Sequence, residues 1–263
     1  GNIVNENECI CTSDYEKERP MRIMVVNDDG IESDGIRRLA GMAAELGEVW
    51  VVAPRHQCSA MSHCITVRGS LHMKEESFPV PGVKAYSVDG TPADCVKVGI
   101  KYLLPQKPDI VFSGINCGYN VGADILYSGT VGAAMEALLN EIPAIAFSEE
   151  RGGSGAAADT HLLPVVRKLL AKQIAKDEIW NVNFPGCPPE ELQGIRENRI
   201  PDRIPFFMDD YRVEEREDKS FCLFVSGKAA QTAGKGTDME AVLERYISIG
   251  KIRNEVLGSR SDG

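Results

Sequence analysis

Two adjacent aspartates, Asp28 and Asp29, stand where a short apolar run gives way to a turn. Residues 22–26 are rich in strand-forming side chains, and the chain then continues Asn27-Asp28-Asp29-Gly30. Neighbouring carboxylates repel each other, and a bound cation is the commonest way to accommodate them. An ordinary polar turn is the alternative interpretation of this segment taken alone.

Oxygen-bearing side chains also follow two other apolar runs. Ser59 lies five residues after the run 49–54, and Asn116 lies in an Asn- and Gly-rich loop that follows the run 109–113. Ligands of open α/β sheets bind at the carboxyl ends of strands, so we expect these groups at one edge. Carboxylate, hydroxyl and carboxamide oxygens suit Mg²⁺ or Mn²⁺ far better than Zn²⁺. Together these residues favour a cation site.

The segment Ser128-Gly129-Thr130 precedes a run of small residues that predicts a helix over 129–139. Free backbone N–H groups and the helix dipole attract anions to such a start. A plain helix N-cap is the alternative for this segment alone. Its position one crossover from the two aspartates favours a phosphate site, because two carboxylates cancel a divalent cation and an anionic substrate then needs further donors.

The segments that carry these residues alternate between strands and helices. We expect strands over residues 22–26, 49–54, 84–88, 109–113, 144–147 and 180–184, and helices over 35–46, after the N-cap Thr91 and over 129–139. Strands that are apolar on both faces belong to parallel sheets covered by helices, with right-handed crossovers. The expected fold is therefore α/β, a doubly wound, mostly parallel, Rossmann-like sheet.

Two segments depart from this alternation. Apolar residues alternate over 64–74 and suggest a hairpin, while 206–216 and 220–226 predict a longer hairpin, with a helix over 238–245 after it. We expect a polar N-terminal tail, an α/β core and a C-terminal hairpin and oligomerisation arm, over residues 1–20, 21–190 and 191–263.

Composition and charge exclude several classes of protein. The 29 Lys and Arg against 39 Asp and Glu give a net charge of −10, which argues against binding a nucleic-acid polymer. No run of about 18 apolar residues predicts a membrane span, and the absence of a signal-like run favours a cytoplasmic location. The eight cysteines include no C-x-x-C pair and are expected to be reduced. A phosphate-bearing substrate would have to be held by local groups.

Several of these segments recur together in one known pattern. It consists of Asn27-Asp28-Asp29-Gly30, Ala53-Pro54 with Ser59 and Ser62-His63, Asp89-Gly90-Thr91-Pro92-Ala93-Asp94, Ser113-Gly114-Ile115-Asn116-x-Gly118-x-Asn120-x-Gly122-x-Asp124 and Tyr127-Ser128-Gly129-Thr130-Val131. This pattern resembles the SurE survival-protein family of divalent-metal-dependent 5′/3′-nucleotidases, or acid phosphatases. The resemblance is dense over residues 21–150 and thin beyond, where Asn181-Val182-Asn183-Phe184-Pro185 is one shared segment.

The resemblance implies a phosphomonoesterase that hydrolyses nucleoside 5′- and 3′-monophosphates to nucleoside and phosphate, assembled as a homodimer or homotetramer. It implies one divalent cation, Mg²⁺ or Mn²⁺, in each subunit. The family's metal ligands correspond to Asp28, Asp29, Ser59 and Asn116, and its phosphate-binding residues to Ser128, Gly129 and Thr130, with Asn120 nearby.

We assign catalysis to Asp28, Asp29 and His63. A cation held by the acids would polarise the phosphoryl group and lower the pKa of a bound water. His63 is the one histidine near the predicted site, and it is a candidate general acid or supporting residue. A purely structural role is the alternative for this histidine.

A Mg²⁺-binding phosphoacceptor domain, the receiver of signalling proteins, is the alternative function. Paired acids after the first strand would suit it, but its phosphorylated Asp should end a central strand, where this chain has Ser113-Gly114-Ile115-Asn116. The chain is also about twice as long as one such module needs. A dinucleotide-dependent oxidoreductase is excluded because no G-x-G-x-x-G follows the first strand.

Overall fold

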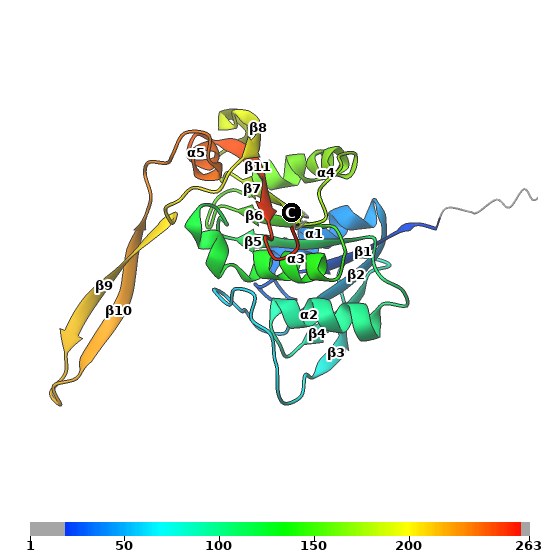
Figure 1. The fold of residues 1–263 in the computed structure, drawn as a ribbon, viewed down its shortest axis with the longest axis horizontal. Helices are drawn as coiled ribbons and strands as arrows, with labels where there is room; N and C mark the ends of the chain where they lie inside the picture. The colour runs from blue at the N-terminus through cyan, green and yellow to red at the C-terminus, as the bar shows by residue number, and fades with distance from the viewer. Residues whose placement is uncertain (1–18, 259–263) are drawn as a thin grey trace, which may run out of the picture.

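Within residues 19–258, which the computed structural model describes, nine strands form one sheet. In chain order they are β1 (Met21–Val26), β2 (Gly47–Pro54), β3 (Met73–Glu76), β4 (Lys84–Val88), β5 (Ile110–Cys117), β6 (Ala144–Glu149), β7 (Glu178–Phe184), β8 (Gly194–Arg199) and β11 (Tyr246–Arg253). Their order across the sheet is β3-β4-β2-β1-β5-β6-β7-β11-β8 (Figure 1). The six strands from β4 to β7 are parallel, whereas β3 and β11 run antiparallel to β4 and β7.

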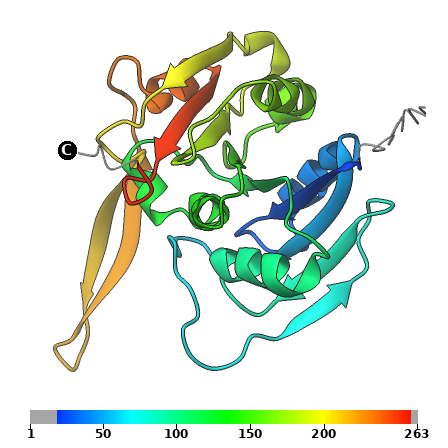
Figure 2. The ribbon, with the colours of Figure 1, turned by 45° about the vertical axis from the view of Figure 1, so that its right-hand side comes forward.

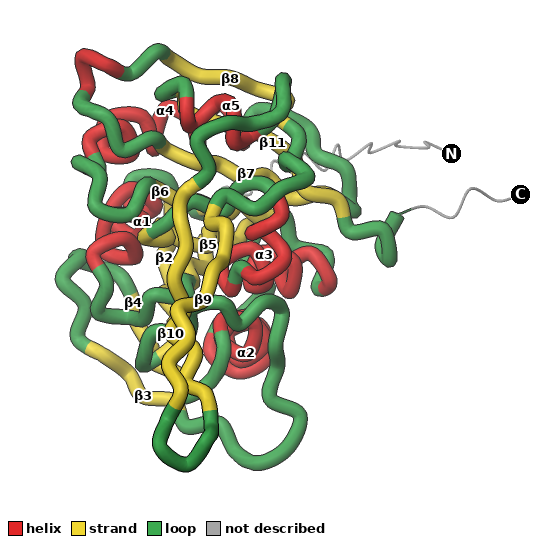
Figure 3. Tube along the Cα trace, turned by 90° about the vertical axis from the view of Figure 1, so that its left-hand side faces the viewer, coloured by secondary structure: helices red, strands yellow, loops and turns green. Residues whose placement is uncertain are grey.

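Helices cover both faces of this sheet. The helices α1 (Asp34–Ala44) and α4 (Ala156–Leu170) lie on one face, and α2 (Pro92–Val98) and α3 (Gly129–Leu139) lie on the other (Figure 3). A large apolar cluster is buried on each face. Short helical turns are η1 (Gly99–Leu103), η2 (Ala123–Tyr127) and η3 (Pro189–Glu191). The predicted doubly wound, mostly parallel α/β fold is confirmed.

The N-terminus of α2 shows how local chemistry fixes these elements. The hydroxyl of Thr91 accepts a hydrogen bond from the N–H of Asp94 at 3.1 Å, and the Asp94 carboxylate accepts one from the N–H of Thr91 at 3.0 Å. This is the reciprocal capping box of a helix start, and Pro92 occupies the first helical position. The predicted N-cap is confirmed.

The order of strands reverses at β1, which lies between β2 and β5. In such sheets the carboxyl ends of the strands beside the reversal flank a crevice where ligands bind. Gly35 lets α1 approach this edge, because a Cβ at this position would lie 2.0 Å from the carbonyl oxygen of Ile115 in β5. A side chain at position 35 would push the helix away from the sheet.

The hairpin predicted over residues 64–74 is wrong. Residues 64–72 form a loop, and β3 begins only at Met73, where it pairs antiparallel with β4. Ile65 and Val67 do alternate with polar neighbours, but both are exposed, Val67 by 79%. Alternation specifies a strand only where one set of side chains is buried, and here neither set is.

The segment after residue 190 is divided between the sheet and a projecting hairpin. Strands β8 and β11 extend the main sheet beyond β7, so the sheet continues past the expected end of the core. The predicted longer hairpin is confirmed as β9 (Phe207–Glu215) and β10 (Phe221–Ala229), which pair only with each other and project from the body (Figure 2). We call residues 207–229 the arm. Helix α5 (Asp238–Leu243) confirms the helix predicted after it.

Two expectations concern properties of the whole chain. Over residues 19–258 no helix is both long and apolar enough to cross a membrane, and the cytoplasmic location stays a prediction. The cysteines in that range are all free, as expected: Cys58, Cys64, Cys95, Cys117, Cys187 and Cys222. Of the predicted polar tail over residues 1–20, residues 1–18 lie outside the described part of the chain.

Candidate active site

Asp28 lies just beyond the end of β1 and is almost fully buried, with 5% of its surface exposed. Its Oδ1 accepts a hydrogen bond of 2.7 Å from the hydroxyl of Thr130 in the first turn of α3. Its Oδ2 lies beside Gly129, where a Cβ would be 3.3 Å from this oxygen and 3.0 Å from Asp28 Cβ. The buried carboxylate therefore faces the N-terminus of α3, and glycine at position 129 permits the close approach.

Asp29 is partly exposed, and its two oxygens connect two further loops. Oδ2 accepts a hydrogen bond of 2.8 Å from the N–H of Cys117 at the end of β5. Oδ1 accepts one of 3.1 Å from Nε2 of Gln57 in the loop after β2. The acids after β1 thus bring together the ends of β1, β2 and β5, as the sequence predicted.

Asn27 places a third oxygen next to the acidic pair in the chain. Its Nδ2 donates to the carbonyl of Gly30 at 2.9 Å and to the hydroxyl of Ser33 at 2.8 Å, which shapes the turn. Its Oδ1 is buried and has no partner among residues 19–258. A buried acceptor in this state costs free energy unless a donor or a cation reaches it.

Asn116 lies near the end of β5, next to the residue that holds Asp29. Its Nδ2 donates to the carbonyl of Gly118 at 2.8 Å, which fixes the amide orientation and leaves Oδ1 as the acceptor. The neighbouring Cys117 N–H binds Asp29. The structure therefore brings the carboxamide predicted as a metal ligand close to the acidic pair.

Ser59 lies in the exposed loop that follows β2. The preceding residue, Cys58, donates its N–H to the backbone carbonyl of Asp28 at 2.7 Å, so this loop is tied to the end of β1. Ser59 itself is exposed, and its hydroxyl makes no hydrogen bond within the described range. The structure thus brings the backbone at Ser59 to the site without a contact from its hydroxyl to Asp28, Asp29 or Asn116.

The start of α3 carries both a cap and free donors. The hydroxyl of Ser128 accepts a hydrogen bond of 3.1 Å from the N–H of Val131, which confirms the N-cap interpretation. The N–H groups of Gly129 and Thr130 donate to no acceptor within residues 19–258. Ser113 in β5 fixes this turn to the sheet by donating to the carbonyl of Thr130 at 2.7 Å. Free donors at a helix start can bind an anion in addition to the cap.

Asn120 is buried, and its side chain is directed at the sheet. Its Nδ2 donates to the hydroxyl of Ser148 in β6 at 2.7 Å. Its backbone is held by the carboxamides of Asn181 and Asn183 from β7. Asn120 therefore lies at the same sheet edge as the acids, without a hydrogen bond to Ser128 or its neighbours in α3.

His63 packs against α3 rather than against the two acids. A Cβ at Gly132 would lie 3.0 Å from the Cα of His63, so the loop contacts the first turn of the helix. The His63 Nε2 lies 2.8 Å from Oε2 of Glu136, whose side chain is 8% exposed. A carboxylate that holds one ring nitrogen orients the ring for proton transfer at the other.

The electrostatics of the site suit a hard divalent cation. Burial raises the pKa of Asp28 from 3.8 to about 6, the hydrogen bond from Thr130 opposes this, and the charge of Asp29 adds to it. A carboxylate that is costly to ionise gains most from a nearby cation. Residues 19–258 contain no group of three His, Cys, Asp or Glu that could hold a metal, and the predicted set has only two such residues. Its other donors are a hydroxyl and a carboxamide, so an oxygen-ligated Mg²⁺ or Mn²⁺ fits these residues.

Comparisons with known proteins match this arrangement to one family. Residues 23–204 match the family model described as survival protein SurE. The chain belongs to the SurE family. It is similar to the 5′-nucleotidase SurE of Methylorubrum populi, with 39% identity over 242 residues that cover 89% of this chain and 93% of the relative. It is also similar to the 5′-nucleotidase SurE of Pelobacter propionicus, with 41% identity over 234 residues, 87% of this chain and 92% of the relative.

A solved structure agrees with the SurE assignment. The crystal structure of the SurE protein from Aquifex aeolicus superposes with a TM-score of 0.76 at 34% identity, covering 88% of this chain and 93% of that one. The receiver alternative has no support from these comparisons. In this SurE-family chain β5 also ends without the aspartate that a receiver phosphorylates.

Several residues that contact the candidate site of this SurE-family chain were not expected from the sequence. Glu136 is a single acid in the otherwise small and apolar helix α3, and that isolation was the available signal. Gln57 lies between two residues of the recognised pattern, but nothing in its type suggested a contact to Asp29. Asn181 and Asn183 alternate with apolar residues in β7, which indicates two carboxamides on one face.

Proposed function

We propose that this chain is a phosphoric monoester hydrolase that cleaves nucleoside 5′- and 3′-monophosphates to nucleoside and phosphate. The observation that carries the proposal is the hydrogen bond between Thr130 and Asp28. It holds a buried carboxylate against the free N–H groups at the start of α3, a pairing suited to a phosphate whose charge is shared with a cation. The names of the relatives, 5′-nucleotidase, support the same substrate class.

The proposed cofactor is one Mg²⁺ or Mn²⁺ in each subunit, held by Asp28, Asp29, Ser59 and Asn116. When bound there, such a cation would supply Lewis acidity and would lower the pKa of a water molecule for attack on phosphorus. Gln57 and Cys117 hold the Asp29 carboxylate in place, and the Gly118 carbonyl holds the amide of Asn116. These contacts orient the oxygens before substrate arrives, which spares reorganisation during the reaction.

The proposed phosphate site is the first turn of α3. The N–H groups of Gly129 and Thr130 would donate to phosphate oxygens, with the Ser128 hydroxyl beside them and Asn120 nearby. His63 would give a proton to the departing ribose oxygen, and Glu136 holds its ring for this step. Uncatalysed phosphomonoester hydrolysis is among the slowest reactions, needing up to ~10²¹-fold acceleration, so positioning and charge neutralisation must supply most of the effect.

A phosphate-release assay tests the proposed function. The substrates are nucleoside 5′- and 3′-monophosphates, each with Mg²⁺, with Mn²⁺ and with excess EDTA. Release that requires a divalent cation and stops with EDTA supports the proposal. No release from any of these nucleotides with either metal refutes it. Stable labelling by acetyl phosphate without turnover would instead indicate a receiver.

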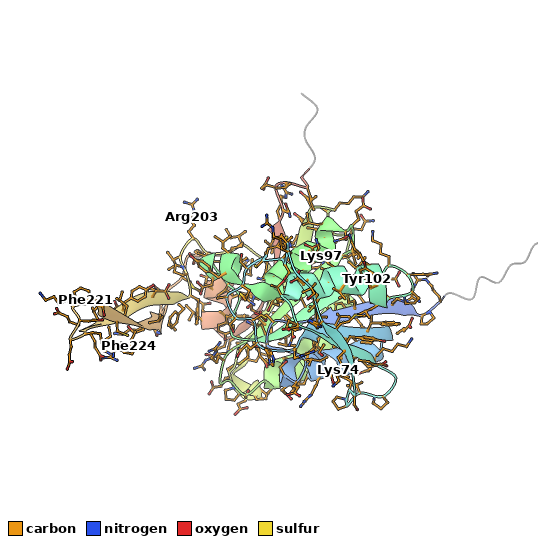
Figure 4. All side chains as sticks on the ribbon, turned by 90° about the horizontal axis from the view of Figure 1, so that it is seen from below. Lys74, Lys97, Tyr102, Arg203, Phe221 and Phe224 are labelled. Atoms are coloured by element: carbon orange, nitrogen blue, oxygen red, sulfur yellow. The ribbon has the colours of Figure 1, made fainter. Side chains whose placement is uncertain are left out.

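We also propose that the chain assembles with further copies of itself, as a homodimer or homotetramer, through the arm. The arm exposes apolar side chains along both strands: Phe207, Met208, Tyr211, Val213, Phe221, Leu223, Phe224 and Val225. Figure 4 shows Phe221 and Phe224 on the projecting hairpin, away from the body. An isolated two-stranded hairpin is marginally stable, and extended apolar patches mark interaction surfaces. A second copy of the chain would cover this surface.

The root of the arm is fixed to the segment that leads into the phosphate site. Oδ2 of Asp124 in η2 accepts hydrogen bonds from the N–H groups of Phe206 at 3.1 Å and Phe207 at 3.0 Å. Burial raises the pKa of Asp124, while these two donors oppose the shift. The turn η2 continues directly into Ser128, so the arm and the start of α3 are anchored to one short segment.

A further inference from the structure

The loop between Asn116 and η2 is held from β7 by two carboxamides. The N–H of Asn120 donates to Oδ1 of Asn183 at 2.9 Å, and the Asn120 carbonyl accepts from Nδ2 of Asn183 at 3.1 Å. Nδ2 of Asn181 donates to the same carbonyl at 2.9 Å. The side chain of Asn183 therefore pairs with the Asn120 backbone as a neighbouring strand would, through one donor and one acceptor.

We call the contacts of Asn181 and Asn183 with the Asn120 backbone the clamp; it is buried and comes from an interior strand of the sheet. Asn183 is 0% and Asn120 is 5% exposed, so water does not compete for their hydrogen bonds. Asn183 sits in β7, where its ladder partners are Ser148 in β6 and Ser248 in β11. The Asn120 side chain in turn donates to the Ser148 hydroxyl. Asn120 is thus fixed to two adjacent strands through its backbone and its side chain.

The two ends of the loop have their own anchors. The N–H of Gly118 donates to the backbone carbonyl of Glu149 at 2.9 Å, which holds the end next to Asn116. The N–H of Gly122 donates to the buried carboxylate of Asp238 at 3.0 Å, which holds the end next to η2. Between these two anchors, the middle of the loop is fixed by the carboxamides of β7 and by the hydrogen bond from Asn120 to Ser148.

We propose that Asn183, supported by Asn181, is a positioning residue for phosphoester hydrolysis, which acts by fixing the Asn120 loop beside the start of α3. The inference rests on the proposed function and adds residues of β7 to it. Because Gly118 is anchored separately, loss of the clamp should displace the loop that leads through η2 into Ser128 and leave the proposed metal ligands in position. Small misplacements of this kind can cost about 100-fold in rate.

The test compares three variants in the full-length protein. Asn183→Ser removes both bonds to Asn120, and Asn181→Ala removes one donor. Ser248→Ala is the matched control, because Ser248 faces Asn183 across the strand pair and its buried hydroxyl has no partner in the described part of the chain. Three quantities are measured for each: the Tm, the Kd for Mn²⁺ alone by calorimetry, and kcat and KM for a nucleoside 5′-monophosphate.

We expect kcat/KM to fall at least tenfold in Asn183→Ser and less in Asn181→Ala, with Ser248→Ala equal to the parent. The Mn²⁺ Kd should stay within about threefold of the parent in all three. An unchanged kcat/KM in folded Asn183→Ser, or a Kd for Mn²⁺ that weakens in parallel with kcat/KM, would overturn the proposal. If Asn183→Ser does not fold, Asn181→Ala decides by the same two criteria. A parent protein without phosphatase activity would instead refute the proposed function, before any variant is compared.

Discussion

The hydroxyl of Thr130 donates a hydrogen bond of 2.7 Å to Oδ1 of Asp28, across 102 positions of sequence. This bond joins the carboxyl end of β1 to the first turn of α3. It lies at the point where the strand order reverses, between β2 and β5. It supports an ionised Asp28 in a site that otherwise disfavours the charge. The Thr130 side chain therefore contacts the proposed metal ligand Asp28 and belongs to the proposed phosphate site.

Removing the charge of Asp28 should abolish activity and stabilise the cation-free protein. Burial raises the pKa of Asp28 from 3.8 to about 6, so the folded state binds its proton more tightly than the unfolded state. The contribution of this proton to the free energy of unfolding is fully present below about pH 4 and is lost as the pH rises through about 6. The change amounts to about 3 kcal/mol. The amide variant Asp28→Asn has no proton to lose and should not show this change. We expect it to lack cation-dependent phosphatase activity and to unfold at pH 7, with EDTA, no earlier than the parent.

Chemical denaturation at pH 4.5 and pH 7 measures this difference. Asp34→Asn is the control, because Asp34 is an acid of α1 whose side chain is 80% exposed. Full phosphatase activity in Asp28→Asn would contradict the metal assignment.

Thr130→Ala should weaken substrate use without unfolding the chain. The variant removes the donor to Asp28 and so raises the pKa of that carboxyl further. A hydrogen bond to a charged group contributes about 1.5–3 kcal/mol, which corresponds to about 10- to 100-fold in kcat/KM. We expect much of the loss as a higher KM for a nucleoside monophosphate, measured by steady-state kinetics. Thr130→Ser keeps the hydroxyl and should stay near the parent, whereas an unchanged kcat/KM in Thr130→Ala argues that the Thr130–Asp28 bond does not contribute to the reaction.

A divalent cation should raise the melting temperature through the same acids. A ligand present at 100 times its Kd stabilises the folded state by about 2.7 kcal/mol. For a chain of this size that corresponds to a rise in Tm of about 5–10 °C. Differential scanning fluorimetry with Mn²⁺ and then excess EDTA measures it. The rise should be absent in Asp28→Asn, and an equal rise in that variant would place the cation elsewhere.

His63→Gln should lower kcat more than it changes KM. If His63 protonates the departing oxygen, its loss should cost about 10²- to 10⁴-fold in kcat and remove one limb of the pH–rate profile. Glu136→Gln should show a smaller loss, because the imidazole is still present but loses the carboxylate that orients it. His72→Gln, at an exposed histidine outside the site, is the control. A His63→Gln variant with the parent's pH–rate profile would leave this histidine a structural role.

A charge on the arm should dissociate the proposed oligomer. Val225 in β10 is 72% exposed, and Val225→Glu would place a carboxylate in the apolar surface that a second copy should cover. Light scattering after gel filtration should find a dimer or tetramer for the parent and a smaller species for the variant. Val256→Glu is the matched control, because Val256 is 89% exposed and lies outside the arm. A parent chain that is monomeric at micromolar concentration would rule the assembly out.

The core of the fold could be predicted because its strands are apolar on both faces and its helices carry recognisable starts, such as Thr91 with Asp94. Strand β8 could not, since Gly194–Arg199 is an edge strand with four charged or polar side chains among its six residues. Helix α4 was not expected, because the glycines between 152 and 155 suggest only a loop before it and Pro164 interrupts its helical apolar spacing. Propensity describes local preference, and pairing with a distant strand overrides it.

In the candidate site, too, the sequence indicates some features and only the fold shows the others. The common location of Asp28, Asp29 and Asn116 could be predicted because polar side chains stand at the ends of neighbouring parallel strands, whose carboxyl ends share one edge of the sheet. The partners of these residues could not, because Gln57 and Glu136 reach their contacts through loop and helix geometry. Asn183 was visible as part of a pattern, but only the fold shows that it contacts Asn120.

The anchoring of the arm by Asp124 limits how the arm can be shortened to test the proposed assembly. Cutting the hairpin off at its base would remove the N–H groups of Phe206 and Phe207 and leave a partly buried carboxylate without donors, four residues before Ser128. Such a truncation would lose activity for a reason unrelated to assembly. A shortened chain intended for inhibitor screening should therefore keep residues 206 and 207 and close the hairpin with a tight turn beyond them.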